Sequence, residues 1–159
     1  KKHNVDLVRA KVGEINVVEE MKALNSEIGG EGNGGVILKE SHLGRDSVVA
    51  TALVLNHFAN QKIPVSKIRN TFPDYQLIKD KVSIDGLEPD SIFTQIKSNF
   101  NDANIDERDG LKLTWQNKWI HIRKSNTEPI MRIYAEAEAI DEISSNINII
   151  KNIIEDSRD

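Results

Sequence analysis

Apolar and polar residues follow the period of β-strands in five segments of the second half of the chain. These segments are residues 75–84, a short run from Ile105, and residues 111–115, 119–122 and 130–137. Asp109-Gly110, just before residues 111–115, is a typical hairpin turn. The last four strands follow one another with short connections, so the pattern predicts a largely antiparallel sheet.

Two other segments of this half repeat apolar residues every three or four positions, as α-helices do. One begins at Glu88-Pro89-Asp90, where proline suits the first helical turn, and the other begins at Asp141. Their apolar faces are Ile92, Phe93, Ile96 and Phe100 in the first helix, and Ile143, Ile147, Ile150 and Ile154 in the second. The order β-α-β-β-β-β-α predicts a compact α+β domain over residues 74–159, with both helices on one face of the sheet.

The first part of the chain mixes helical and strand-like patterns. Asn16 and Glu19 have the spacing of a capping box, which predicts a helix from Asn16 to about Asn25. Residues 5–8 and 36–38 have the composition of short strands. These elements predict a piece of an α/β layer over residues 1–70, with a domain boundary around residues 66–74.

A second helix is predicted in this part, over about residues 47–59, with Asp46 as its N-cap. Its apolar residues cover more than one stripe, so we expect it to be buried on most sides. The strands of residues 1–70 are too few for a covered sheet, which suggests that an N-terminal portion of this domain is missing.

Composition narrows the class of protein. The 159 residues are 38% hydrophobic and include no cysteine, which excludes disulfides, iron–sulfur clusters and thiol catalysis. No apolar run approaches the roughly 20 residues of a membrane helix, and no signal peptide is visible, so we expect a cytoplasmic protein without a membrane partner. The net charge of −4 argues against nucleic-acid binding, which usually requires a basic face.

Residues 29–35 form a loop in which five of seven residues are glycine. Within it, the Glu31 carboxylate could accept hydrogen bonds from two neighbouring hydroxyls, and the Asn33 amide could both donate and accept. The loop is therefore a candidate site for a polyol. A flexible connection between two strands is the simpler alternative, because glycine-rich loops are common connectors.

Residues 123–129, Arg-Lys-Ser-Asn-Thr-Glu-Pro, join two predicted strands and carry many hydrogen-bond donors. A guanidinium fork, two hydroxyls and several backbone N–H groups suit a phosphate dianion. The alternative is an ordinary hairpin loop with a surface pair between Glu128 and Arg132, which would contribute little stability.

Three segments, in this order, resemble motifs of the α-D-phosphohexomutases, the superfamily of phosphoglucomutase, phosphomannomutase and phosphoglucosamine mutase. Residues 123–129 read R-K-S-N-T-E-P, and the phosphate loop of the family reads R-x-S-[GN]-T-E-P. Residues 30–35 read G-E-G-N-G-G, beside the family's G-E-x-S-G-[HG], and residues 9–14 read R-A-K-V-G-E, beside its R-T-x-V-G-[DE]. The resemblance covers essentially the whole chain. It implies part of the family's third domain followed by its TATA-binding-protein-like fourth domain.

The resemblance also implies roles for individual residues. The residues that match the family's grip on the non-reacting phosphate are Arg123, Ser125, Asn126 and Thr127. Glu31 matches the residue that binds adjacent sugar hydroxyls, and Asn33 stands where serine is common. Lys11 matches a basic residue near the sugar phosphate.

Three positions depart from the family pattern. Lys124 replaces a frequent proline or alanine, Gly35 stands where many members have a histidine that contacts the sugar, and Ser47 stands where glycine is usual. No segment matches the phosphoserine nucleophile or the aspartate-rich magnesium loop, which belong to the family's first two domains. The resemblance therefore places Mg²⁺ in the parent enzyme and no metal ligand in this chain.

The expected function is part of an isomerase that interconverts hexose 6-phosphate and hexose 1-phosphate, with hexose 1,6-bisphosphate as intermediate or activator. The expected partners are a phosphorylated hexose and the missing N-terminal domains of the same enzyme. Without the phosphoserine and the metal loop, we expect this chain alone to be inactive. A non-catalytic phosphosugar-binding module is the alternative, and the preferred hexose stays open.

Overall fold

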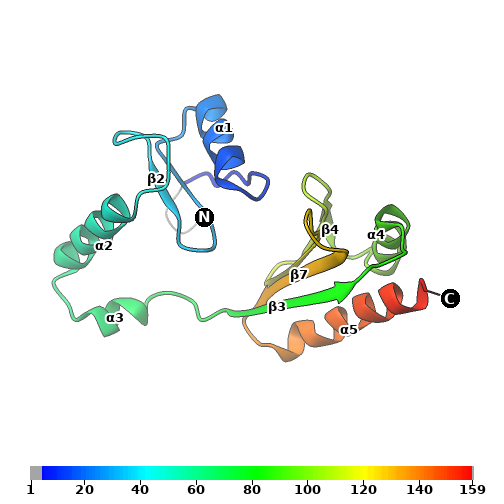
Figure 1. Ribbon diagram of the computed structural model, residues 1–159. Helices are drawn as coiled ribbons and strands as arrows, with labels where there is room; N and C mark the ends of the chain where they lie inside the picture. Colours follow the sequence, from blue (N-terminus) through cyan, green and yellow to red (C-terminus); the bar gives the residue numbers. More distant parts are fainter. Residues whose placement is uncertain (1–4, 159) are drawn as a thin grey trace. The chain divides into compact units, whose positions relative to one another are not determined.

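The computed structural model describes residues 5–158, and the chain divides into two compact units, one up to Phe72 and one from Pro73 onward (Figure 1). The first unit consists of α1 (Glu14–Leu24), β1 (Ile28–Gly30), β2 (Val36–Leu38), α2 (Ser47–Gln61) and α3 (Val65–Arg69). β1 and β2 form a two-stranded antiparallel sheet in which Gly30 pairs with Val36. The two strands therefore hold both ends of the glycine-rich loop.

α1 begins two residues before the predicted cap, directly after Gly13, so the prediction of Asn16 as N-cap is wrong. Gly13 adopts a φ of 119°, which residues with a side chain rarely adopt, and its carbonyl accepts the backbone N–H of Asn16. The Asn16 side chain instead donates to the carbonyl of Val12 at 2.9 Å. The predicted end of the helix is confirmed, because Asn25 takes the left-handed conformation that ends many helices.

α2 has the predicted cap but not the predicted burial. The Asp46 Oδ1 accepts the backbone N–H groups of Val48, at 2.7 Å, and Val49, at 3.0 Å. None of the α2 residues that the structure describes is buried, and Val48 and Leu55 are 76% and 60% exposed. A two-stranded sheet is too small to cover an apolar helix, and residues 5–8, predicted as a further strand, have no regular structure.

The second unit has the predicted order β-α-β-β-β-β-α. Its elements are β3 (Gln76–Ser83), α4 (Pro89–Asn99), β4 (Asn104–Asp106), β5 (Leu111–Thr114), β6 (Lys118–Lys124), β7 (Ile130–Ala137) and α5 (Asp141–Asp156). The strands form one antiparallel sheet in the spatial order β3-β7-β6-β5-β4. Since β6 and β7 are interior strands, the loop between them is held by paired backbone on both sides.

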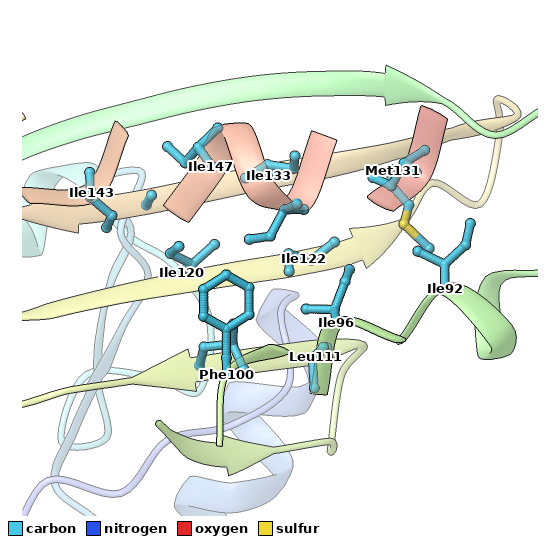
Figure 2. Close-up of a cluster of buried hydrophobic side chains, with 14 of the residues drawn as sticks. Ile92, Ile96, Phe100, Leu111, Ile120, Ile122, Met131, Ile133, Ile143 and Ile147 are labelled. Atoms are coloured by element: carbon cyan, nitrogen blue, oxygen red, sulfur yellow. The ribbon is translucent and has the colours of Figure 1, made fainter. Parts of the chain in front are cut away.

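α4 and α5 pack on one face of this sheet, as predicted, and their side chains meet those of β5, β6 and β7 (Figure 2). Every second residue of β7 from Met131 to Ala137 is fully buried on that face. The helices contribute Ile92, Ile96 and Phe100 from α4, and Ile143, Ile147, Ile150 and Ile154 from α5. Burial of each such isoleucine contributes about 1.5–3 kcal/mol to the stability of the fold. This core therefore holds β6 and β7 in place, the strands that flank the candidate phosphate loop.

Within residues 5–158, no helix combines the length and the apolar character needed to cross a membrane.

Candidate functional site

The glycine-rich loop between β1 and β2 is a hydrogen-bonded turn. The backbone N–H of Glu31 donates to the carbonyl of Gly35 at 2.9 Å, and that of Gly34 donates to the carbonyl of Glu31 at 3.0 Å. The Asn33 Oδ1 accepts the backbone N–H of Gly35 at 3.0 Å. Gly34 adopts a φ of 96°, which favours glycine at this position. Both candidate sugar contacts therefore lie on backbone of defined conformation.

Glu31 and Asn33 lie in different surroundings on this loop. The Glu31 side chain is only 15% exposed, and its Oε2 lies 3.2 Å from Nη1 of Arg45. Asn33 is exposed and uses its Oδ1 within the loop, so its Nδ2 is the group it can offer as a donor. A carboxylate that accepts and an amide that donates, both on one loop, suit sugar hydroxyls, because each hydroxyl both donates and accepts.

Arg45 was not predicted as a site residue. Its backbone N–H donates to Oε1 of Glu14 at 2.8 Å, and its Nε donates to Oε2 of the same carboxylate at 2.9 Å. These hydrogen bonds, the backbone one foremost, hold the pKa of Glu14 below its usual value. The sequence did contain a signal. Arg45 stands just before Asp46, the N-cap of α2, and the positive N-terminal end of a helix disfavours a cation, so an arginine there indicates a carboxylate partner.

An open pocket of about 590 Å³ adjoins this loop. Its lining consists of Glu14, Asn33, Gly34, Gly35, Val36, Arg45, Asp46 and Ser47. The structure thus brings Asn33 and Arg45 to the same pocket. Lys11 is not among the described residues that line it, and lies exposed in the irregular segment before α1.

The second candidate loop, residues 125–129, connects β6 and β7. Ser125 is 6% exposed, and its backbone N–H donates to the carbonyl of Ile130 at 2.9 Å. The Ser125 Oγ lies 3.4 Å from both the Oγ1 and the backbone N of Thr127, distances too long for strong hydrogen bonds. The pair between Glu128 and Arg132 is present at 3.1 Å. The loop therefore gathers hydroxyl and N–H groups that bind one another only weakly.

Arg123 lies in β6, just before this loop, and the surroundings of its Nε bear on whether the loop binds an anion. Its Nε is buried and has no hydrogen-bond partner among the residues that the structure describes. An unpaired buried donor costs about 1–3 kcal/mol, and more when the group is charged. An anionic acceptor would remove that cost, so the surroundings of Arg123 favour a bound anion.

Arg123 also lines an open pocket of about 420 Å³ at the N-terminus of α4. Its full lining is Glu88, Pro89, Asp90, Phe93, Asp109, Gly110, Arg123, Lys124 and Asn126. The lining holds three carboxylates and two cations, so it has no excess of positive charge. An anion here therefore depends on direct contact with Arg123 and Lys124, helped by the positive end of α4.

Part of each predicted group shares one loop, and Lys11 stands apart from Glu31 and Asn33 in the segment before α1. Glu31 and Asn33 share the β1–β2 loop, while Ser125, Asn126 and Thr127 share the β6–β7 loop that follows Arg123.

The described residues include no group of three or more histidine, aspartate and glutamate side chains that could hold a metal ion. Residues 5–158 therefore do not provide a ligand set for the Mg²⁺ that the resemblance implies, and no chemical step is assigned to a metal on this chain.

Two models of one protein family match the chain. Phosphoglucomutase/phosphomannomutase, alpha/beta/alpha domain III, matches residues 1–75. Phosphoglucomutase/phosphomannomutase, C-terminal domain, matches residues 82–147. The two matches follow the division of the chain into two units and together account for most of its length.

Curated relatives are similar along nearly the whole chain. The phosphoglucosamine/phosphogalactosamine mutase of Sulfurisphaera tokodaii is 31% identical over 157 residues, which are 97% of this chain and 34% of the relative. The phosphoglucomutase/phosphomannomutase of Thermococcus kodakarensis is 30% identical over 159 residues, which are 99% of this chain and 35% of the relative. The chain therefore spans about a third of the length of these relatives.

A solved structure shows the same fold. The crystal structure of a phosphoglucomutase/phosphomannomutase family protein from Burkholderia thailandensis matches with a TM-score of 0.72 at 18% identity. The match covers 94% of this chain and 32% of that protein. With both family models matched in order and the fold shared, the chain belongs to the phosphoglucomutase/phosphomannomutase family and corresponds to its C-terminal part.

Proposed function

We propose that this chain is the substrate-binding C-terminal part of a phosphohexomutase, an isomerase that interconverts hexose 6-phosphate and hexose 1-phosphate. Family membership supports the reaction class, and the relatives are named as mutases of phosphorylated glucose, mannose, glucosamine and galactosamine. One observation carries the role of this chain. It is the buried, unpartnered Nε of Arg123 at the start of the R-K-S-N-T-E-P segment.

In this proposal, Arg123 donates to the oxygens of the phosphate that is not reacting. A guanidinium has its donors in a planar fork that matches two oxygens of one phosphate. Ser125 and Thr127 add hydroxyl donors, which their long mutual contact of 3.4 Å leaves available, and the exposed Asn126 adds its amide. These contacts are charge-assisted, and they are stronger than hydrogen bonds between neutral groups.

The β1–β2 loop binds the sugar ring. Glu31 accepts hydrogen bonds from adjacent hydroxyls, and Asn33 donates through the Nδ2 that its own loop does not use. Lys11 is retained in the proposal as a cation near the sugar phosphate. Hydroxyls of this kind are common to glucose, mannose and glucosamine phosphates, so the two loops together define the class of substrate rather than one sugar.

Both loops contribute to catalysis by positioning. Holding the sugar and the remote phosphate aligns the reacting end, and that binding energy assists the chemistry there. We assign phosphoryl transfer, through hexose 1,6-bisphosphate and with Mg²⁺, to domains outside residues 1–159. We assign residues 1–70 to part of the third domain, which carries the sugar loop, and residues 74–159 to the phosphate-binding domain.

Calorimetric titration of the chain with glucose 6-phosphate, glucose and inorganic phosphate tests this proposal. We expect glucose 6-phosphate to bind at least tenfold more tightly than either fragment, because it carries both of the groups that the two loops are proposed to bind. Equal affinity for glucose 6-phosphate and phosphate would refute the role of the sugar loop.

A chimera separates an enzyme part from a binding module. In it, this chain replaces the matching third of the Thermococcus kodakarensis relative. Mutase activity of the chimera supports the enzyme. If the chimera binds the sugar phosphate but does not turn it over, a non-catalytic phosphosugar-binding module becomes the better reading.

A further inference from the structure

Arg45 joins two carboxylates that are far apart in the sequence. It binds Glu14 through its backbone N–H and its Nε, at 2.8 and 2.9 Å, and it reaches Oε2 of Glu31 through Nη1 at 3.2 Å. Glu14 stands at the start of α1, Glu31 stands in the glycine-rich loop, and Arg45 itself stands just before α2. The guanidinium therefore ties the loop to the ends of two helices.

The stem of Arg45 is fixed as well as its head. A Cβ placed on Gly35 would collide with Cδ of Arg45 and would lie 3.2 Å from its Cγ. Gly35 is thus the place where the loop backbone packs directly against the arginine stem. Gly32, in the same loop, has no atom within 4 Å of such a Cβ, so this part of the loop is open.

This arrangement fixes the direction of the Glu31 carboxylate. Arg45 pairs with Oε2, so Oε1 is the oxygen that the proposed site would offer to a sugar hydroxyl. A glutamate side chain free to rotate loses up to about 2 kcal/mol of conformational entropy when a ligand orders it. A carboxylate that is already held by an arginine has lost part of that freedom before binding, which favours the ligand.

We propose that Arg45 is a positioning residue for Glu31 in sugar binding, and that Glu14 and Gly35 hold Arg45 in place for this role. The inference rests on the proposed role of Glu31 in binding sugar hydroxyls. Arg45 acts through Glu31 and needs no contact of its own with the sugar.

A double-mutant cycle tests it. The quantity measured is the sugar advantage, defined as the affinity for glucose 6-phosphate divided by the affinity for inorganic phosphate. We expect Glu31→Gln and Arg45→Met each to lower the sugar advantage about tenfold, and the double variant to lose no more than Glu31→Gln alone. Arg45→Lys should recover part of the loss, since an ammonium can pair with Glu31 but cannot fork two carboxylates.

A matched control accompanies the cycle. Lys62→Met removes a cation at the other end of α2 and should leave the sugar advantage unchanged. A further variant, Gly35→Ala, should lower the sugar advantage, because the added Cβ would collide with Cδ of Arg45 and would also lie 3.2 Å from Oδ1 of Asn33. Amide spectra of each variant report whether it is folded. Arg45→Lys, which keeps the positive charge, keeps the test decisive if Arg45→Met does not fold.

Binding by the wild-type chain distinguishes a failure of the proposed sugar site from a failure of the role of Arg45. If the wild-type chain has no sugar advantage, the proposed sugar site is refuted, and this inference falls with it. If the wild-type chain has the advantage and Arg45→Met retains it, only the inference is refuted. Losses that add in the double variant would also refute it, because Arg45 would then act independently of Glu31.

Discussion

Gly110 lies directly against the backbone of Arg123. A Cβ on Gly110 would come within 3.0 Å of both Cα and Cβ of Arg123 and would collide with the carbonyl of Ile122. Gly110 also has a φ of 72°, and its neighbour Leu111 pairs with Ile122 across β5 and β6. The hairpin turn before β5 is therefore packed onto the residue that we propose grips phosphate.

Replacing Gly110 by alanine should destabilise the fold more than replacing Gly86. Both glycines have φ values above 70°, so each alanine variant bears about 1–2 kcal/mol of backbone strain. Gly86 has open space around its Cβ position, whereas Gly110 adds an overpacking cost of about 1–3 kcal/mol. Urea unfolding of the two variants measures the difference. Equal losses in the free energy of unfolding would show that the close contact of Gly110 with β6 does not contribute to stability.

Arg123→Met should weaken phosphate binding without destabilising the free chain. Charged hydrogen bonds of about 1.5–3 kcal/mol are lost, which corresponds to roughly 10–100-fold in affinity. The free energy of unfolding without ligand should rise by about 1–3 kcal/mol, because the substitution removes a buried donor that has no partner. Lys97→Met, at the far end of α4, is the control for loss of charge. A large loss of stability with unchanged phosphate affinity would contradict the assignment of Arg123 to phosphate binding.

Acid should weaken the turn before Gly110. Hydrogen bonds from the Arg108 side chain, and then from its backbone N–H, lower the pKa of Asp106 from 3.8 to about 2. A lowered pKa stabilises the folded chain above pH 4, and that contribution is lost as the pH falls through about 2. Asp106→Asn should therefore be less stable than the wild type at pH 6, with the difference shrinking toward pH 2.

Urea unfolding at pH 6, 4 and 2 checks the Asp106 prediction, with Asp156→Asn at the exposed end of α5 as control. A deficit of Asp106→Asn that is constant over these three pH values would contradict the role of its carboxylate.

The isoleucine stripe of α5 offers a comparison within one helix. Ile150 is fully buried in the core, whereas its neighbour Ile149 is 43% exposed. Ile150→Ala should cost about 2–5 kcal/mol, since it removes buried methyl groups and leaves a cavity. Ile149→Ala should change stability much less. Thermal or urea unfolding measures both, and similar losses would mean that α5 does not pack as described.

The second unit was predictable because the spacing of apolar residues within each strand and helix indicates which side chains are buried. Met131, Ile133 and Ala135 alternate with polar residues, and Ile143 and Ile147 recur at the helical period. The first unit was less predictable, since partners distant in the sequence decide its details. The helix that was expected to begin at Asn16 begins after Gly13, and none of the α2 residues that the structure describes is fully buried.

The candidate site divides in the same way. Motif and composition identified the R-K-S-N-T-E-P loop and the pair of Glu31 with Asn33. The contact between Gly110 and Arg123 depends on the register of β5 and β6. The ion pair between Arg45 and Glu31 forms where the glycine-rich loop approaches the start of α2. Spacing along the sequence predicts neither contact, and the position of Arg45 near the start of α2 indicates a carboxylate partner without identifying Glu31.

We propose two half-sites on this chain, one for the sugar and one for the phosphate. A residue-resolved NMR titration with glucose 6-phosphate, mannose 6-phosphate and glucosamine 6-phosphate, with inorganic phosphate as control, tests this proposal most directly. We predict that the sugar phosphates shift the amides of residues 29–35 and 123–128, whereas inorganic phosphate shifts only residues 123–128. If neither loop responds at millimolar ligand, the proposal is contradicted.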